Sequence, residues 1–245
     1  MQAIKSGFMY LCLCWLHVLT LFQKLLAKYR HEPDFTDVIL FNDKTLKSNE
    51  MHKNGNCPRR FCTPCRVNRL IAYIDNAQVC MDIAHLVITH DSIFKAVLAA
   101  WYRGVNVRIV TDPEMVHIRG SQMRKLCSHC IPIHVAAKRT IMHHKFTIID
   151  GEQRILQLGS EERLKAARLL QRRGIVMTGS LNWTEQGTRH NYENVVITSN
   201  RKVIARYQEI FDNLYNYYAQ LTIIFSELYH SEIEKIPDRN AKDFY

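Results

Sequence analysis

The sequence predicts an α/β domain with a mixed central sheet flanked by helices. Residues 79–90 are largely apolar, as the buried central strand of such a sheet should be. An amphipathic helix is expected at 91–104, with Asp91 as its N-cap and Gly104 as its stop. Residues 105–112 have the pattern of the next strand. A strand, a helix and a strand in this order predict a βαβ unit with a right-handed crossover.

Length and composition allow one sizeable domain and favour an anionic partner. The chain has 245 residues, of which 47% are hydrophobic, and only 9 Gly and 6 Pro, which excludes a disordered chain. The formal net charge of +10 favours nucleic acid or an acidic lipid surface and does not choose between them. Eight cysteines without a cleavable secretory signal favour metal binding over disulfide bonds.

The first part of the chain predicts a membrane anchor. Residues 7–22 are almost entirely apolar, and basic residues follow at Lys24, Lys28 and Arg30. We expect residues 1–30 to form an uncleaved anchor with a basic flank, with the rest of the chain in the cytosol. A buried or interfacial helix is the alternative. The folded domain is expected at 31–230, and a charged tail at 231–245.

The remaining elements follow from apolar spacing. Strands are expected at 35–41 and 131–135, and helices at 67–77 and 115–128. Residues 201–221 predict a long amphipathic helix rich in tyrosine. Aromatic residues at helical spacing favour core or dimer packing over a platform for stacked bases.

A cysteine-rich insertion at 52–66 predicts a zinc site. Three thiols and one imidazole within 14 residues can supply the four ligands of a tetrahedral zinc ion, at His52, Cys57, Cys62 and Cys65. Such a site would be structural, because it leaves no position open for catalysis. Cysteines without a metal are one alternative. Another is a site completed by Cys127 and Cys130, which we rank lower because these thiols suit the packing of a helix end.

The residues with the clearest chemistry lie at 142–150. His143 and Lys145 are two positions apart in a strand-like segment, so their side chains share one face. An imidazole and a fixed cation on one patch suit attack on a phosphodiester. Asp150 is an odd number of positions from both, so we expect it to face away and to support the site. His144 also faces away, and we interpret it as packed or solvent-facing.

A second group of polar residues follows at 179–194. Gly179 begins a small turn that carries two neutral hydrogen-bond donors, Ser180 and Asn182. Glu193 opens another apolar strand and suits the orientation of a histidine. With His143, Lys145 and Asp150, these residues resemble the HKD signature of the phospholipase D superfamily. The segments MHHKF and TGSLNWT most resemble those of its single-motif mitochondrial branch, that of Zucchini and mitochondrial cardiolipin hydrolase.

The resemblance implies a phosphodiesterase mechanism in a homodimer. Two chains would face their single motifs across a twofold axis, and one His143 would form a phosphohistidine. The partner's His143 would protonate the leaving oxygen and then activate water. Lys145 and Asn182 would stabilise the phosphoryl charge, and Glu193 would orient the imidazole. The resemblance also implies the mitochondrial outer membrane and a zinc-binding insertion at the cysteine cluster. We expect no catalytic metal.

Residues 152–174 depart from the family pattern, which joins the flanking strands within a few residues. This insertion is helix-forming and strongly charged. It is either a surface excursion near the groove or a change that spoils the active centre.

The leading functional prediction is therefore a membrane-anchored phosphodiesterase. Cleavage of single-stranded RNA in piwi-interacting RNA production is the first expectation, because basic residues are spread over the soluble part. Hydrolysis of cardiolipin to phosphatidic acid is the second. A catalytically inactive scaffold that binds RNA or lipid is the alternative from another class.

Overall fold

The computed structural model describes residues 33–42, 62–136, 140–159 and 174–233. The chain divides into two compact units, Met1–Asp34 and Phe35–Tyr245, and the second contains the sheet. The expected anchor at 7–22, the first two zinc ligands and most of the 152–174 insertion lie outside the described residues. Within the described ranges, no helix combines the length and apolarity needed to cross a bilayer.

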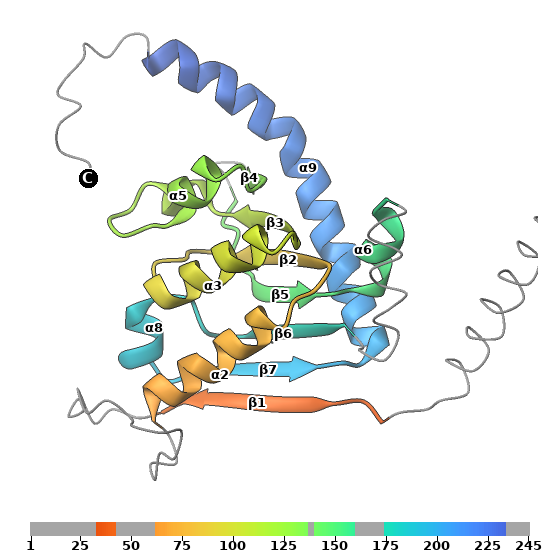
Figure 1. Cartoon of the computed structure of the whole chain (residues 1–245). Coiled ribbons are helices and arrows are strands. Elements are labelled where there is room, and N and C mark those ends of the chain that lie inside the picture. Colours follow the sequence, from red (N-terminus) through yellow and green to blue (C-terminus); the bar gives the residue numbers. More distant parts are fainter. Residues whose placement is uncertain (1–32, 43–61, 137–139, 160–173, 234–245) are drawn as a thin grey trace, which may run out of the picture. The chain divides into compact units, whose positions relative to one another are not determined.

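Seven strands form one mixed sheet in the order β1-β7-β6-β5-β2-β3-β4 (Figure 1). Strands β2, β3 and β4 are parallel, whereas the neighbours from β1 to β2 are antiparallel. The strand bounds are β1 Thr36–Phe41, β2 Cys80–His85, β3 Asn106–Thr111, β4 Ile133–Val135, β5 Lys145–Ile149, β6 Ile175–Gly179 and β7 Glu193–Thr198. The expected mixed sheet is thus confirmed, including the parallel pair joined by a helix at 91–102.

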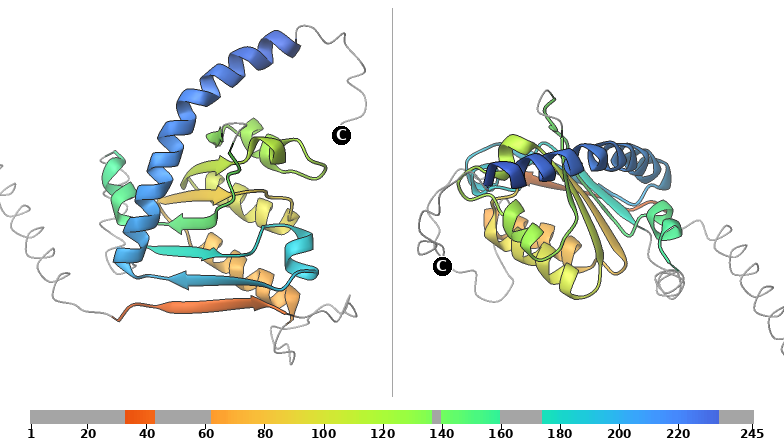
Figure 2. Two further views of the ribbon diagram at one scale, coloured as in Figure 1. Left: turned by 180° about the vertical axis from the view of Figure 1, so that it is seen from behind. Right: turned by 90° about the horizontal axis from the view of Figure 1, so that it is seen from above.

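Helices cover the two faces of the sheet differently (Figures 1 and 2). Helices α2 (Thr63–Asp75) and α3 (Asp91–Tyr102) pack on one face, while α9 (Arg201–Ile233) crosses the other. Four short helices complete the described part: α4 Pro113–Val116, α5 Met123–Ser128, α6 Glu152–Gln157 and α8 Glu185–Arg189.

The alternation of side chains along the strands separates two cores. Ile83, Met177 and Ile197 point to the α2 and α3 face and form the larger core with residues such as Leu70 and Val97. Ala84 and Val176 lie one position after Ile83 and one before Met177 and point to α9, as does Phe146 of β5. Tyr218 belongs to this second core and is 6% exposed, which agrees with the packing role expected for the tyrosines of this helix.

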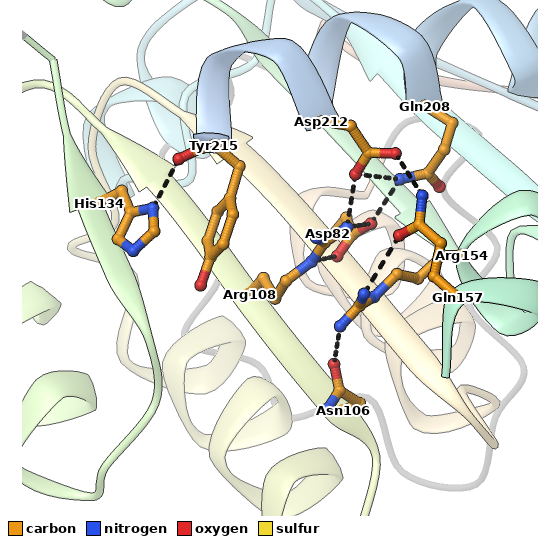
Figure 3. Close-up of polar contacts among 9 residues, drawn as sticks. All are labelled: Asp82, Asn106, Arg108, His134, Arg154, Gln157, Gln208, Asp212 and Tyr215. Carbon is orange, nitrogen blue, oxygen red and sulfur yellow. Dashed lines mark hydrogen bonds and ion pairs between the residues drawn. The ribbon is translucent and has the colours of Figure 1, made fainter. Parts of the chain in front are cut away.

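A paired set of charged side chains lies on the α9 face (Figure 3). Arg108 of β3 donates to Asp82 of β2 at 2.6 and 2.8 Å and to Asp212 of α9 at 2.8 Å. Gln208 of α9 also donates to Asp82, at 2.7 Å. The same network reaches α6, where Gln157 donates to Asp212 at 3.0 Å. The start of the 152–174 insertion is therefore joined to the body of the domain.

Two expectations about helix limits were wrong in detail. The single helix expected at 115–128 is interrupted between α4 and α5, where Gly120 has a φ of +85° that a helix interior does not accommodate. The N-cap of α3 is His90, and Asp91 is its first residue. An acidic residue in the first turn has the same favourable effect on a helix as one residue earlier, so the sequence pattern does not separate the two positions.

Candidate active site

The side chains of His143 and Lys145 lie together at one end of the sheet, here called the His85 end. Lys145 begins β5 and pairs across the sheet with His85, the last residue of β2. His143 lies two residues before the strand and is exposed. The Lys145 ammonium donates to the His143 carbonyl at 2.9 Å and lies 3.3 Å from both ring nitrogens of His143. The predicted pairing of an imidazole with a cation is therefore present in the structure.

The surroundings of Lys145 leave its positive charge weakly opposed. Burial lowers the pKa of the Lys145 ammonium, and the nearby Glu193 carboxylate opposes only part of this effect. Within the described part of the chain, no carboxylate forms an ion pair with it. Such a cation is available to stabilise negative charge on a phosphoryl group.

Glu193 and Ser180 form a second part of the site. Glu193 begins β7 beside the end of β6, where Gly179 pairs with Val195. Its carboxylate accepts hydrogen bonds from the Ser180 hydroxyl and from Asn191 Nδ2, the latter at 2.9 Å. Because the carboxylate is engaged in this way, the sequence-based role of Glu193 in orienting His143 stays a prediction.

Gly179 allows β6 and β7 to approach at this point. A Cβ added to Gly179 would lie 2.0 Å from the Asn194 carbonyl oxygen, which no real side chain tolerates. The close approach lets the Ser180 N–H donate to Asn194 O and the Asn194 N–H donate to Ser180 Oγ, both at 3.1 Å. The glycine of the motif is thus explained by backbone packing.

Asn182 stands on a loop fixed to the end of β2. The carbonyl of the next residue, Trp183, accepts from the N–H groups of Thr89 and His90 at 2.9 and 3.0 Å. Asn182 Oδ1 is buried and lacks a hydrogen-bond partner among the described residues. A buried amide oxygen costs free energy when it has no donor, so hydrogen bonding of this atom within the described residues does not explain the position of Asn182.

Asp150, predicted together with the catalytic residues, does not lie with them. It follows β5 at the opposite end of the strand from Lys145, where the N–H groups of Gln78, Val79 and Cys80 donate to its carboxylate at 2.7 to 3.3 Å. Its φ of +52° places it in a left-handed turn. Asp150 therefore fixes the connection from α2 to β2 and does not touch the reacting groups.

His144 lies on the α9 side, as its position in the sequence implies. Its ring makes an edge contact with Phe146, 5.5 Å between centroids. Burial, followed by the charges of Lys145 and His143, lowers the pKa of His144. The backbone carbonyl of His144 accepts from Leu86 N–H, so the residue helps to hold the motif against β2.

A cleft of about 390 Å³ opens beside His143. Its lining is about equally polar and apolar and comes from the motif segment and from α9: Ile141, Met142, His143, His144, Leu214 and Tyr218. Ile141 is 75% exposed, an unusual state for a large aliphatic side chain. The sequence did not predict this cleft, because the α9 residues are about 70 positions from the motif and only the fold brings them together.

Two further residues of the site were missed by sequence reasoning. Asp112 accepts from Met142 N–H at 3.0 Å and from Glu114 N–H at 3.0 Å, so its buried carboxylate holds the segment that carries His143. His85 is buried beside Lys145 and stacks on Trp183. Neither has a recognisable signal in the sequence, because each was read as the interior or end of an apolar strand.

The predicted zinc ligands are only partly described. Cys62 is buried at the start of α2 and Cys65 is half-buried in its first turn, whereas His52 and Cys57 lie outside the described residues. Cys127 and Cys130, the alternative pair, are exposed. Cys127 lies within α5 and Cys130 follows it. In the described ranges, no three His, Cys, Asp or Glu side chains are grouped to hold a metal ion.

The sheet brings His143, Lys145, Ser180 and Asn182 together at one end, the arrangement that the sequence predicts for a phospholipase D-type site. The family model described as cardiolipin synthase, PLD-like domain, matches residues 70–215. The chain belongs to this family and is a hydrolase of phosphodiesters.

Curated relatives narrow the comparison. A protein from Chlamydomonas reinhardtii named mitochondrial cardiolipin hydrolase is 32% identical over 74% of this chain and 73% of its own length. The Drosophila melanogaster protein of the same name is 34% identical over 67% of this chain and 64% of its own length. The human one is 28% identical over 61% of this chain and 50% of its own length.

Two solved structures share the fold. Nuc from Salmonella typhimurium, a phospholipase D family member, covers 75% of this chain and 95% of its own, with a TM-score of 0.53 and 22% identity. NucT from Helicobacter pylori covers 74% of this chain and 96% of its own, with a TM-score of 0.52 and 20% identity.

Proposed function

We propose that this protein hydrolyses a phosphodiester bond of cardiolipin at the mitochondrial surface and releases phosphatidic acid. The observation that carries the proposal is the cleft beside His143, to which Ile141, Met142 and Leu214 contribute apolar side chains. A phosphoryl group within reach of His143 has its glycerol and acyl substituents next to this cleft. The names of the curated relatives, mitochondrial cardiolipin hydrolase, support the same substrate and location.

His143 would act as the nucleophile. Its imidazole nitrogen would attack phosphorus, and the bond from phosphorus to the leaving glycerol oxygen would break, giving a phosphohistidine. Water would then attack phosphorus, break the N–P bond and regenerate the imidazole. Lys145 and Asn182 would stabilise the phosphoryl oxygens in both steps.

The leaving oxygen needs a proton, and two neighbouring imidazoles are unsuited to provide it. His144 packs toward Phe146, away from Lys145, and His85 is uncharged. Burial, followed by the charge of Lys145, lowers the pKa of His85 to about 3, so His85 is uncharged at neutral pH. We therefore propose a homodimer in which the His143 of a second copy donates this proton and later activates water. Light scattering of the active protein, corrected for bound detergent, should give twice the chain mass. An active monomer would exclude the scheme with two equivalent histidines.

Cleavage of single-stranded RNA is the second candidate, and the net charge of +10 favours it. The described basic residues support it less than the whole sequence does. Arg69 is paired with Asp37, and several of the remaining basic residues lie outside the described ranges: Arg59, Arg60, Lys138 and Arg139. The inactive scaffold remains the outcome if neither substrate is turned over.

The deciding experiment offers both substrates to the full chain in the presence of a chelator. Cardiolipin vesicles and a labelled unstructured RNA are assayed in parallel, with wild type, His143→Ala and His129→Ala. His129 is a half-buried histidine that contacts Tyr102, and its replacement serves as a matched control. Cardiolipin turnover that is lost only in His143→Ala supports the proposal. RNA cleavage with intact cardiolipin reverses the order of the two candidates.

A structural zinc ion is proposed separately. Cys62 and Cys65 start α2, so ligands from the preceding insertion would anchor that helix. Elemental analysis should find about one zinc per chain, following the four-ligand arithmetic. Zinc lost in Cys127→Ser but kept in Cys57→Ser would show that the other pair of cysteines binds it.

A further inference from the structure

His85 occupies an unusual position in the active site. It is 3% exposed and directly opposite Lys145 in the antiparallel pair of β2 and β5. Its ring lies 4.1 Å from the ring of Trp183, centroid to centroid, with 30° between the planes. Its Nδ1 atom is buried and lacks a hydrogen-bond partner among the described residues. An unpaired buried nitrogen is costly, so hydrogen bonding of this atom within the chain does not explain the residue.

The contacts of His85 join the two parts of the site. Lys145, on one side, belongs to the motif strand, and Trp183, on the other, follows Asn182 directly in the sequence. Backbone bonds connect the same segments, because Thr89 N–H donates to Trp183 O and Leu86 N–H donates to His144 O. His85 is therefore the side chain that contacts both the lysine strand and the asparagine loop.

The lack of charge on the ring suits this position. A cation here would repel Lys145, and a carboxylate would neutralise the charge that the phosphoryl group needs. An uncharged flat ring fills the space, excludes water from the buried side of the lysine and leaves its ammonium directed at His143.

We propose that His85 is a positioning residue, whose ring, stacked on Trp183, fixes the Lys145 ammonium and the Asn182 amide in their places around the phosphoryl group. The role rests on the proposed function only in assuming that these two groups bind phosphate. It depends on the shape of the ring and its contacts, not on proton transfer.

The test compares His85→Phe, which keeps a flat ring, with His85→Ala, which removes it. The full chain is assayed with bis(p-nitrophenyl) phosphate, a phosphodiester that is neither lipid nor RNA. Ile74→Val is the matched control, since Ile74 is a fully buried residue near the Asp150 end of the sheet. All rates are measured at a temperature at which each variant is folded by circular dichroism.

We expect His85→Phe to keep kcat within about threefold and His85→Ala to lose at least about tenfold in kcat, because small misplacement of catalytic groups is costly. Ile74→Val should keep wild-type kcat. Equal losses in Phe and Ala would assign the role to the imidazole nitrogen and overturn the proposal, as would full activity in Ala.

Binding of inorganic phosphate, measured by calorimetry, separates this inference from the proposed function. If wild type cleaves no phosphodiester yet binds phosphate, and only His85→Ala binds it at least about tenfold more weakly, the positioning role stands and the proposed function fails. If His85→Ala binds phosphate as wild type does, or wild type does not bind it, the positioning role is overturned.

Discussion

Arg108 and Lys145 are basic side chains of the same sheet, and their charges have different surroundings. Arg108 of β3 is 7% exposed and is held by the carboxylates of Asp82 and Asp212 (Figure 3). The rings of Phe211 and Tyr215 lie about 5 Å from its guanidinium. Lys145 of β5 contacts His143 and the uncharged His85.

The pKa shifts of the two groups run in opposite directions for this reason. Burial alone would lower the pKa of Arg108, but the hydrogen bonds and charges of Asp82 and Asp212 outweigh it and raise the pKa. Burial lowers the pKa of Lys145, and the Glu193 carboxylate compensates for only part of this effect. A cation that holds elements together is neutralised within the fold, whereas one that serves an anionic ligand is left partly unopposed.

Replacing Lys145 by Met should have a large effect on catalysis and little on stability. We expect kcat to fall by about 10²- to 10³-fold, the usual loss when one stabilising donor is removed. The melting temperature should not fall, because no ion pair is broken. Thermal unfolding and steady-state rates check both parts. A large loss of stability would remove the contrast with Arg108.

His143→Ala should abolish turnover, whereas His144→Ala should keep a measurable fraction of it. Only His143 lies with Lys145, while His144 packs toward Phe146 and α9. Some loss is expected in His144→Ala because its side chain lines the cleft. Rates for the two purified variants, measured with the same substrate, decide the assignment, and comparable activity in both would contradict it.

Replacing Arg108 by Met should have the opposite effect to the lysine variant. It leaves Asp82, which is 1% exposed, without its principal partner, and the free energy of unfolding should drop by about 3–5 kcal/mol. Denaturant unfolding measures the change. Adding Asp82→Asn should recover part of it, because the uncompensated buried charge is then gone.

Acid should destabilise the protein through His85 by a smaller amount. Its pKa is about 3 in the folded protein and near 6.5 in the unfolded chain, so the unfolded chain binds more protons between these values. The stability contribution is complete above pH 6.5 and is lost as the pH falls toward 3. At pH 5 the loss should be about 2 kcal/mol. Denaturant unfolding of His85→Phe should show a weaker decline, and an unchanged decline would exclude His85 as its source.

Sequence reasoning located the chemistry better than its surroundings. The alternation of side chains in a strand placed His143 with Lys145 and His144 away from them, and the structure has this arrangement. The apolar run at 79–90 was interpreted as a central strand, and Cys80–His85 forms one, but Asp82 and His85 within it were not recognised. Their roles depend on Arg108 and Trp183, which are 26 and 98 positions away. Spacing along the chain carries no information about such partners.

The sequence by itself determined the parallel βαβ unit, the mixed character of the sheet, and the membership of the phospholipase D-like family. These follow from local patterns, periodicity and short motifs, which a chain expresses within a few residues. Only the tertiary structure decided that Asp150 holds a turn, that Arg108 is neutralised, and that α9 completes a cleft beside His143. Each of these depends on contacts between distant segments, and such contacts exist only once the sheet has brought its strands together.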